Sequence, residues 1–278
     1  MTFRTYFAVP DKDRSDLMGQ VTAQRARVAE RLATVRSVVT VVSGKGGVGK
    51  SFTTASLAVA AARRGLAVGV VDADLRSPTV ARMLGAAGPL AVGESGVTPA
   101  AGAAGVRVMS ADFLLDDGKP LVWREPPAEG FVWRGAMEVG ALRAFLGDVA
   151  WGALDLLLVD LPPGADGMSD MATLAPALAG AVAVTIPSEE SRRSVARTMR
   201  ALVDGGQTVL GVIENMAGYA CGACGHVGPL FRGSAGTDLA GEFRVDLLGR
   251  IPFDPSATPE EPGRAWGTIV DMLIERLR

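Results

Sequence analysis

The chain has 278 residues, of which 48% are hydrophobic and 21% are charged, and its formal net charge is -2. This composition excludes a globally disordered chain, and the slight acidic balance argues against nucleic-acid binding by bulk electrostatics. The charged start does not resemble a secretory signal, and the longest apolar candidate, residues 174–186, is too short to span a bilayer. With two cysteines in all, we expect a cytoplasmic protein with no nucleic-acid or membrane partner.

Predicted helices and strands alternate along almost the whole chain. Apolar residues at helical spacing predict a surface helix over residues 15–36, and short β-branched or aliphatic runs predict buried strands. The expected strands are residues 37–43, 66–71, 106–109, 154–159, 181–186, 208–213 and 247–251. The expected helices include residues 50–64, ended by Gly65 at the C′ position, 188–203 and 260–277.

This alternation favours an α/β fold with a mostly parallel sheet and helices on both faces. Residues 85–105, rich in Gly, Ala and Pro, are predicted to be a surface loop. Residues 116–135, which include three prolines and three glycines, are predicted to be a long excursion beside the site. Because the same alternation resumes afterwards, we predict a helical extension over residues 1–36 and one domain over residues 37–278.

The segment GKGGVGKS matches the phosphate-loop pattern G-x-x-x-x-G-K-S, between a predicted strand and a predicted helix. Glycines let backbone N–H groups curl around an anion, and the helix dipole adds attraction. In such a loop Lys50 reaches the β- and γ-phosphates, and the Ser51 hydroxyl binds Mg²⁺. The sequence therefore predicts a P-loop NTPase rather than a plain glycine-rich turn. The predicted nucleotide contacts here are Gly44, Lys45, Gly46, Gly47, Val48, Gly49, Lys50, Ser51 and Phe52.

Three aspartates follow predicted strands. Asp72 and Asp74 come after residues 66–71, and Asp160 comes after the run LLLV. Ligands bind at the carboxyl ends of parallel strands, so these side chains are expected near the nucleotide. Asp160 has the place of a Walker B aspartate, which holds Mg²⁺ through water. Asp72 is expected to help near the metal ion or, alternatively, to cap the next helix.

The second loop lysine, Lys45, makes this segment resemble the deviant Walker A group of dimeric ATPases. That group includes the MinD/ParA proteins, the nitrogenase iron protein and the Mrp-like (ApbC-type) iron–sulfur carriers. The resemblance implies that Lys45 reaches the partner's γ-phosphate; a solvated lysine is the alternative. It also implies that Asp74, in DADLRSPT, orients the attacking water, and that Gly164, in DLPPG, senses the γ-phosphate.

The segments around these residues depart from the carriers' pattern. RSP (residues 76–78) replaces the more usual Y-G-P and is reminiscent of bacterial tyrosine kinases, although this chain lacks their tyrosine-rich tail. After DLPPG the usual Gly-Asp pair is altered. Either Asp166 or Asp170 is therefore expected to take the place of the aspartate in that pair. ENM (residues 214–216) and IPFDP (residues 251–255) resemble the family's base-binding segments. They imply that Asn215 reads the adenine beside Pro252; alternatively, Asn215 is a strand-end turn residue.

The two cysteines form the pair Cys221 and Cys224, close to the only histidine, His226. A C-x-x-C pair offers two thiolates, whereas a zinc ion or a [4Fe–4S] cluster usually takes four ligands, which a two-fold homodimer supplies. The Mrp-like carriers bridge a labile cluster in this way, so the resemblance implies a cluster at Cys221 and Cys224. A zinc site, a redox dithiol and an incidental pair remain alternatives, and His226 is the weaker candidate ligand.

Further similar segments, WRGAM (133–137), DVAWG (148–152) and residues 231–240, extend the resemblance over about residues 37–255. It implies a slow homodimeric ATPase that binds ATP, Mg²⁺ and a [4Fe–4S] cluster and delivers the cluster to apo-proteins. The alternative is a MinD/ParA-type spatial-organisation ATPase without a cluster, which needs a membrane- or DNA-binding surface. The final predicted helix could be such an interfacial helix, but packing in the core is favoured because acidic residues dilute its basic face.

Overall fold

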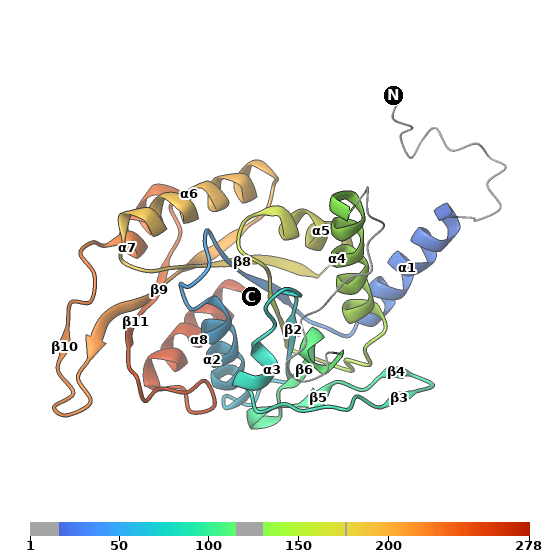
Figure 1. The fold of residues 1–278 in the computed structure, drawn as a ribbon, viewed down its shortest axis with the longest axis horizontal. Helices are drawn as coiled ribbons and strands as arrows, with labels where there is room; N and C mark the ends of the chain where they lie inside the picture. The colour runs from blue at the N-terminus through green and yellow to red at the C-terminus, as the bar shows by residue number, and fades with distance from the viewer. Residues whose placement is uncertain (1–16, 115–129, 176) are drawn as a thin grey trace.

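The computed structural model describes residues 17–114, 130–175 and 177–278 (Figure 1). Its helices are α1 (Leu17–Leu32), α2 (Lys50–Ala62), α3 (Val80–Met83), α4 (Gly130–Gly147), α5 (Asp166–Leu174), α6 (Glu189–Asp204), α7 (Ala235–Phe243) and α8 (Arg264–Arg276). The strands are β1 (Val38–Ser43), β2 (Val68–Asp72), β3 (Val92–Gly93), β4 (Gly96–Val97), β5 (Ala100–Ala101), β6 (Arg107–Ser110), β7 (Leu156–Asp160), β8 (Leu178–Thr185), β9 (Val209–Ala220), β10 (Val227–Gly228) and β11 (Leu247–Phe253).

The main sheet has the strand order β10-β9-β8-β1-β7-β2-β6-β5, and β11 pairs with β9. Every pairing is parallel except those of β10 and β5. The order places β1, which leads into the phosphate loop, between β7 and β8. In the neighbouring pair, Asp72 at the end of β2 is in register with Asp160 at the end of β7. The mostly parallel sheet therefore brings the predicted carboxylates to one edge, beside the loop.

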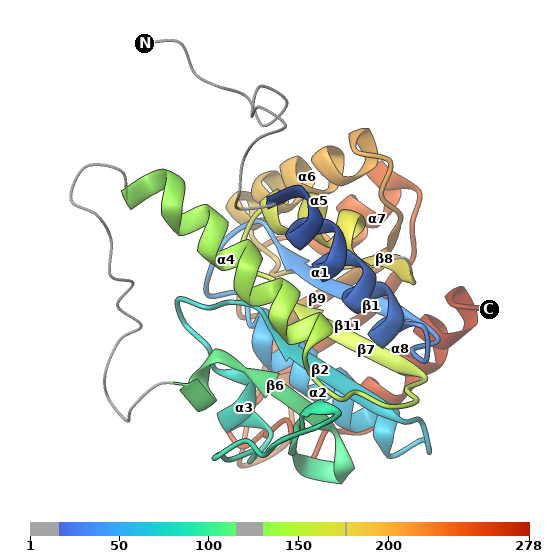
Figure 2. The same ribbon diagram turned by 90° about the vertical axis from the view of Figure 1, so that its right-hand side faces the viewer.

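Helices cover both faces of the sheet (Figures 1 and 2). One core contains buried residues of α1, α4, α5, α6 and α7, and a second contains those of α2, α3 and α8. β1 is buried along its whole length, with Val38 and Val42 in the first core and Val39 in the second. Figure 2 shows α1 and α4 lying side by side on the outside of the first layer. The predicted fold class is confirmed.

The strongly apolar predicted elements are confirmed within a few residues. The end of α2 also follows the prediction: Gly65 has φ +83° and donates to the Ala62 oxygen, while Leu66 donates to the Ala61 oxygen. This pair of hydrogen bonds is the Schellman arrangement, with Gly65 at C′. The final helix begins at Arg264, later than predicted, because Pro262 disfavours helix at the residue before it. Trp266, Ile269, Val270 and Leu273 are buried, so α8 packs in the core.

Two loop predictions are wrong in part. Residues 85–105 contain the β3–β4 ribbon and β5, which are too short for a visible alternation of polar and apolar residues. Residues 130–135 belong to α4, whose buried Leu142, Phe145 and Leu146 fix it on the core although glycine is a poor helix former. Residues 115–129, with the three prolines, lie outside the described residues, as do residues 15–16 of the predicted first helix. None of the described helices is both long and apolar enough to cross a membrane.

Candidate nucleotide site and cysteine hairpin

The phosphate loop joins β1 to α2 and is held closely from one side. Gly47 and Gly49 have φ of +79° and +81°, a region that glycine adopts without steric cost. A Cβ at Gly44 would lie 2.3 Å from the carbonyl carbon of Ser194 in α6, so the two backbones meet here. Ser194 Oγ also donates to the Gly44 oxygen at 2.6 Å. The first part of the loop is thereby fixed against α6.

Three side chains of α2 converge on the buried carboxylate of Asp160. Lys50 Nζ lies 2.7 Å from Asp160 Oδ2 in a buried ion pair. Ser51 Oγ donates to the same oxygen at 2.6 Å, and Thr54 Oγ1 donates to Oδ1 at 2.8 Å. Lysine, hydroxyl and carboxylate thus meet at the start of α2. Ser51 and Asp160 together offer the hard oxygen donors that Mg²⁺ prefers, so the residues present fit that ion.

Asp72 is fully buried beside this cluster, and its hydrogen bonds reach the start of α3. Its Oδ2 accepts from the Thr79 and Val80 N–H groups at 2.9 and 3.0 Å and from Ser110 Oγ at 3.1 Å. Its Oδ1 has no partner among the described residues. Burial, and after it the nearby charge of Asp160, raises the pKa of Asp72 to about 7. Asp72, at the end of β2, therefore holds the start of α3 and so fixes both ends of the loop that carries Asp74.

The remaining predicted catalytic residues lie on loops around the strand ends. Asp74 is half-buried in the turn after β2, and Gly164 has φ +110° in the segment after β7. The Gly164 N–H donates to the Ser43 oxygen at 2.8 Å, so in this structure it is bonded to the end of β1. Lys45 is half-buried, and its ammonium has no hydrogen bond or ion pair within the described part of the chain. Asp166 and Asp170 both lie in α5.

The predicted base contacts lie against the protein itself. Asn215 is within β9 rather than after it, because the strand continues to Ala220 through its pairings with β10 and β11. Its Nδ2 donates to the Val48 oxygen at 2.9 Å. Phe52 packs against Trp266 of α8, with ring centroids 6.3 Å apart. Pro252 is half-buried in β11.

The two cysteines lie at the turn between β9 and β10, on a hairpin that projects at one end of the molecule (Figure 1). The Cys221 N–H donates to the His226 oxygen, and the Gly225 N–H donates to the Cys221 oxygen, which closes the turn. Cys221 is half-buried, and Cys224 is exposed. The N–H groups of Ala223 and Cys224, and then the Cys224 thiol, hold the pKa of Cys221 below its usual value. Such bonds favour a thiolate, the form that binds metal.

Several residues of the site escaped the sequence reasoning. Thr54 is one helical turn beyond Lys50, and that spacing was the available signal. Ser110 meets Asp72 because β6 pairs with β2 in register, which no local pattern reveals. Glu214 is fully buried, accepts from the Gly236 N–H at 2.8 Å and pairs with Arg250 Nε at 2.7 Å, which ties β9 to α7 and β11. Ser194, which fixes Gly44, carried no signal.

A strand-to-helix glycine loop whose lysine and serine converge on the aspartate of a neighbouring strand defines the chain as a P-loop NTPase. The profile of the ParA family, described as NUBPL iron-transfer P-loop NTPase, matches residues 34–265, and the chain belongs to that family.

Individual relatives agree with this assignment. An iron-sulfur cluster carrier protein of Saccharolobus solfataricus is 41% identical over 248 residues, which is 88% of this chain and 80% of the relative. A nucleotide-binding protein of Archaeoglobus fulgidus, solved with ADP and with cobalt found in it, matches with a TM-score of 0.68 and 32% identity, covering 90% of this chain and 92% of that one. The cell-division ATPase MinD of Pyrococcus furiosus, 22% identical, shares the fold, with a TM-score of 0.56 over 87% of this chain and 100% of its own.

Proposed function

We propose that this chain is an ATPase that carries a [4Fe–4S] cluster between two copies of itself and passes it to apo-proteins in the cytoplasm. The observation that carries the proposal is a pair of free thiols, one half-buried and one exposed, in the turn that directly follows the strand that contacts the phosphate loop. Relatives named as iron-sulfur cluster carriers support the choice of cargo. Two free cysteines are consistent with a reducing compartment.

In the nucleotide half, Lys50 and the loop N–H groups bind the phosphates. Ser51 and Asp160 would hold Mg²⁺, which would supply positive charge against the phosphates. Asp74 orients a water molecule, which attacks the γ-phosphorus as the bond to ADP breaks. Gly164 must release the Ser43 oxygen before it can donate to the γ-phosphate. Lys45, which has no partner within the described residues, is available to a second copy.

In the cargo half, one chain supplies two thiolates. The described residues contain no group of three or more His, Cys, Asp and Glu side chains that could hold a metal ion. A cluster that takes four ligands therefore requires a second copy, and a two-fold axis through the hairpins brings together Cys221 and Cys224 of both.

The surroundings of the cysteines support such an interface. Five large apolar side chains near the hairpin, the hairpin collar, are more than a third exposed; they are Tyr219, Val227, Leu230, Phe231 and Phe253. The Tyr219 and Phe253 rings stack, with centroids 6.4 Å apart. Exposed apolar groups gathered around a half-site are typical of a surface that another protein covers.

The test of the nucleotide half compares three variants in ATP binding and hydrolysis. Lys50→Ala and Ser51→Ala should both lose tight Mg²⁺·ATP binding, and Lys45→Ala should bind ATP but lose hydrolysis. Calorimetry and phosphate release measure the two properties, and circular dichroism checks that each variant is folded. Normal hydrolysis by folded Lys50→Ala would exclude this lysine from the site.

The test of the cargo half is anaerobic reconstitution with iron and sulfide, followed by absorbance and mass measurement. The native chain should form a brown dimer with one cluster. Cys221→Ser and Cys224→Ser should lose the cluster but keep ATP binding, and His226→Ala, the matched control, should keep both. Iron loading that survives in Cys221→Ser, or a colourless dimer that holds zinc instead, would contradict the cluster assignment.

The shared fold leaves a second candidate, a MinD/ParA-type spatial-organisation ATPase without a cluster. The apolar face of α8 is buried in the core, which leaves that helix no apolar face for a membrane. Co-sedimentation with anionic liposomes in the presence of ATP separates the candidates. Strong ATP-dependent lipid binding without iron uptake would favour the second one.

A further inference from the structure

β9 changes its partners abruptly after Asn215. Up to that residue the strand is held on both sides, because its last pairs are Glu214 with Thr185 of β8 and Asn215 with Ile251 of β11. The next pair with β11 joins Tyr219 to Phe253. Residues 216–218 of β9 therefore face the single residue Pro252, which has no N–H to donate. This two-residue excess is a β-bulge, a feature that bends a strand and is enriched next to active sites.

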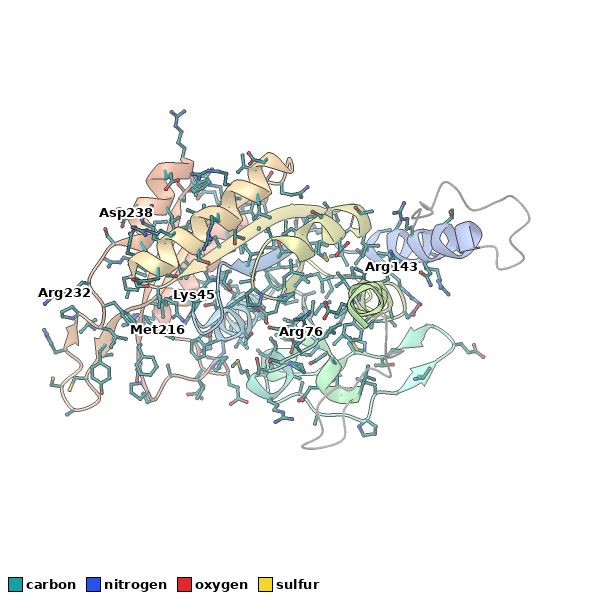
Figure 3. The ribbon with its side chains drawn as sticks, turned by 45° about the horizontal axis from the view of Figure 1, so that its top comes forward. Lys45, Arg76, Arg143, Met216, Arg232 and Asp238 are labelled. Atoms are coloured by element: carbon teal, nitrogen blue, oxygen red, sulfur yellow. The ribbon has the colours of Figure 1, made fainter. Side chains whose placement is uncertain are left out.

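The bulge begins at a residue with an uncommon backbone conformation. Met216 has φ +52°, one of three non-glycine residues with positive φ in the described chain. Unbranched residues other than Asn and Asp rarely adopt this region, and such outliers gather where the surroundings impose them. Met216 packs against the apolar cluster of Val41, Val48, Val184 and Ile186. This packing helps to hold its backbone in the uncommon conformation. Figure 3 shows Met216 at the same end of the molecule as Lys45.

The bulge touches the phosphate loop at one peptide unit. Asn215 Nδ2 donates to the Val48 oxygen at 2.9 Å, and Asn215 is almost fully buried. A Cβ at Gly49 would lie 2.1 Å from the same nitrogen and 3.8 Å from the Met216 methyl carbon. In a trans peptide the N–H points away from the C=O, so the Gly49 N–H points away from Asn215. Any rotation of this peptide unit by a phosphate must therefore change the hydrogen bond to Asn215.

Beyond the bulge the strand has different partners. Residues 219 and 220 pair with the two residues of β10, and Tyr219 also pairs with Phe253, but β8 no longer contacts them in the ladder. Cys221 follows directly. The arm that carries the cysteines thus extends from a bent, irregular segment whose start is bonded to the phosphate loop.

We propose that Asn215 and Met216 are positioning residues that transmit the state of the phosphate loop to the cysteine pair, so that bound nucleotide sets the orientation of Cys221 and Cys224. The inference rests on the proposed function, because it assumes that the loop binds nucleotide and that the cysteines bind the cargo. It assigns to Asn215 a role through Val48 that is distinct from contact with the base. By linkage, metal at the cysteines must change nucleotide affinity by the same factor as nucleotide changes metal affinity.

The first test measures how fast iodoacetamide alkylates the cysteines. The chain has only these two, so the label on the whole protein reports the hairpin alone. Reduced, metal-free protein is alkylated with and without saturating Mg²⁺·ADP, and mass spectrometry follows the rates. In the native chain nucleotide should change the rate about fivefold or more, the lower end of common coupling strengths.

Two variants remove the amide donor. Asn215→Ala deletes it, and Asn215→Asp keeps the size but cannot donate to the Val48 oxygen. At nucleotide concentrations that saturate each variant, the rate ratio should fall to about one in both. Thr208→Ala, an exposed change at the residue before β9, is the matched control and should keep the native ratio. A nucleotide-dependent ratio that persists in either Asn215 variant would overturn the proposal.

A measurement on the native chain alone keeps the inference testable if the variants do not fold. Nucleotide affinity is measured by calorimetry with the cysteines free and with Co²⁺ bound to them. A change equal to the effect of ADP on Co²⁺ affinity supports the link. Unchanged affinity, with both ligands bound, would refute the link while leaving the proposed function intact. A chain that binds neither ADP nor Co²⁺ would instead refute the proposed function.

Discussion

The phosphate loop and the cysteine hairpin lie on either side of the bulge and are built in opposite ways. In the loop, Gly44 touches the backbone of α6 and Lys50 is buried. A Cβ added at Gly49 would clash with Asn215. In the hairpin, Gly222 has open space where a Cβ would be, and Cys224 is exposed. The loop is preorganised by one chain, as a site for a concentrated charge requires. The hairpin offers only two thiolates, and in the proposed function a second copy of the chain supplies the other two.

The largest expected difference between the two regions is their tolerance of a methyl group. Gly44→Ala should lower the free energy of unfolding by about 3 kcal/mol, because its Cβ would meet backbone atoms that cannot rotate away. Gly222→Ala, in the hairpin, should change it by less than about 0.5 kcal/mol. Urea denaturation measures both. Equal losses of stability would show that the two regions are packed alike and would contradict the difference described here.

The next effect is a pH dependence of the free energy of unfolding, which we expect from Asp72 on the nucleotide side. An aspartate in an unfolded chain titrates near pH ~4, whereas the pKa of Asp72 is about 7. Between these values the folded state binds more protons than the unfolded state, so the free energy of unfolding falls as pH rises. From pH 5 to pH 8 this group should account for a loss of about 2.5 kcal/mol, which Asp72→Asn should not show. Denaturation at the two pH values measures this; identical slopes in both proteins would contradict it.

The contrast also explains what could be predicted from the sequence. The loop was predictable because its chemistry is local: β1 is a continuous apolar run, and GKGGVGKS directly follows it. The meeting of Asp72 with Ser110 depends instead on the register of β2 and β6. The bulge depends on the pairing of β9 with β11, more than thirty residues away in sequence. Neither β9 beyond Ile213 nor α4 at Gly130 carries the strong apolar periodicity that made the other elements visible.

A smaller loss of stability is expected when the buried hydrogen bond between Thr54 and Asp160 is removed. Thr54→Val keeps the shape of the side chain but leaves Asp160 Oδ1 without its hydroxyl donor. The cost should be about 1.5 kcal/mol in the free energy of unfolding, because a buried acceptor loses its partner. The affinity for Mg²⁺·ATP should fall as well, since Asp160 then keeps its partners on Oδ2 alone and is oriented less firmly. Thr237→Val on the exposed side of α7 is the control. A variant as stable and as Mg²⁺-responsive as the native chain would exclude Thr54 from positioning Asp160.

The smallest expected effect on the folded chain lies in the hairpin collar and has the largest consequence for assembly. Phe253→Ala removes one ring of the exposed Tyr219–Phe253 stack, and the free energy of unfolding should fall by only about 0.5 kcal/mol. If the collar is covered by a second copy, the same change should weaken the cluster-loaded dimer at least tenfold, because an aromatic side chain at an interface centre carries much of the binding energy. Analytical ultracentrifugation under anaerobic conditions measures the dimer. The control is Val203→Ala, which truncates an exposed apolar side chain on α6, outside the collar, and should leave association unchanged. Undiminished dimers in Phe253→Ala would mean that the copies meet elsewhere, and the exposed rings would then be available to the apo-protein that receives the cluster.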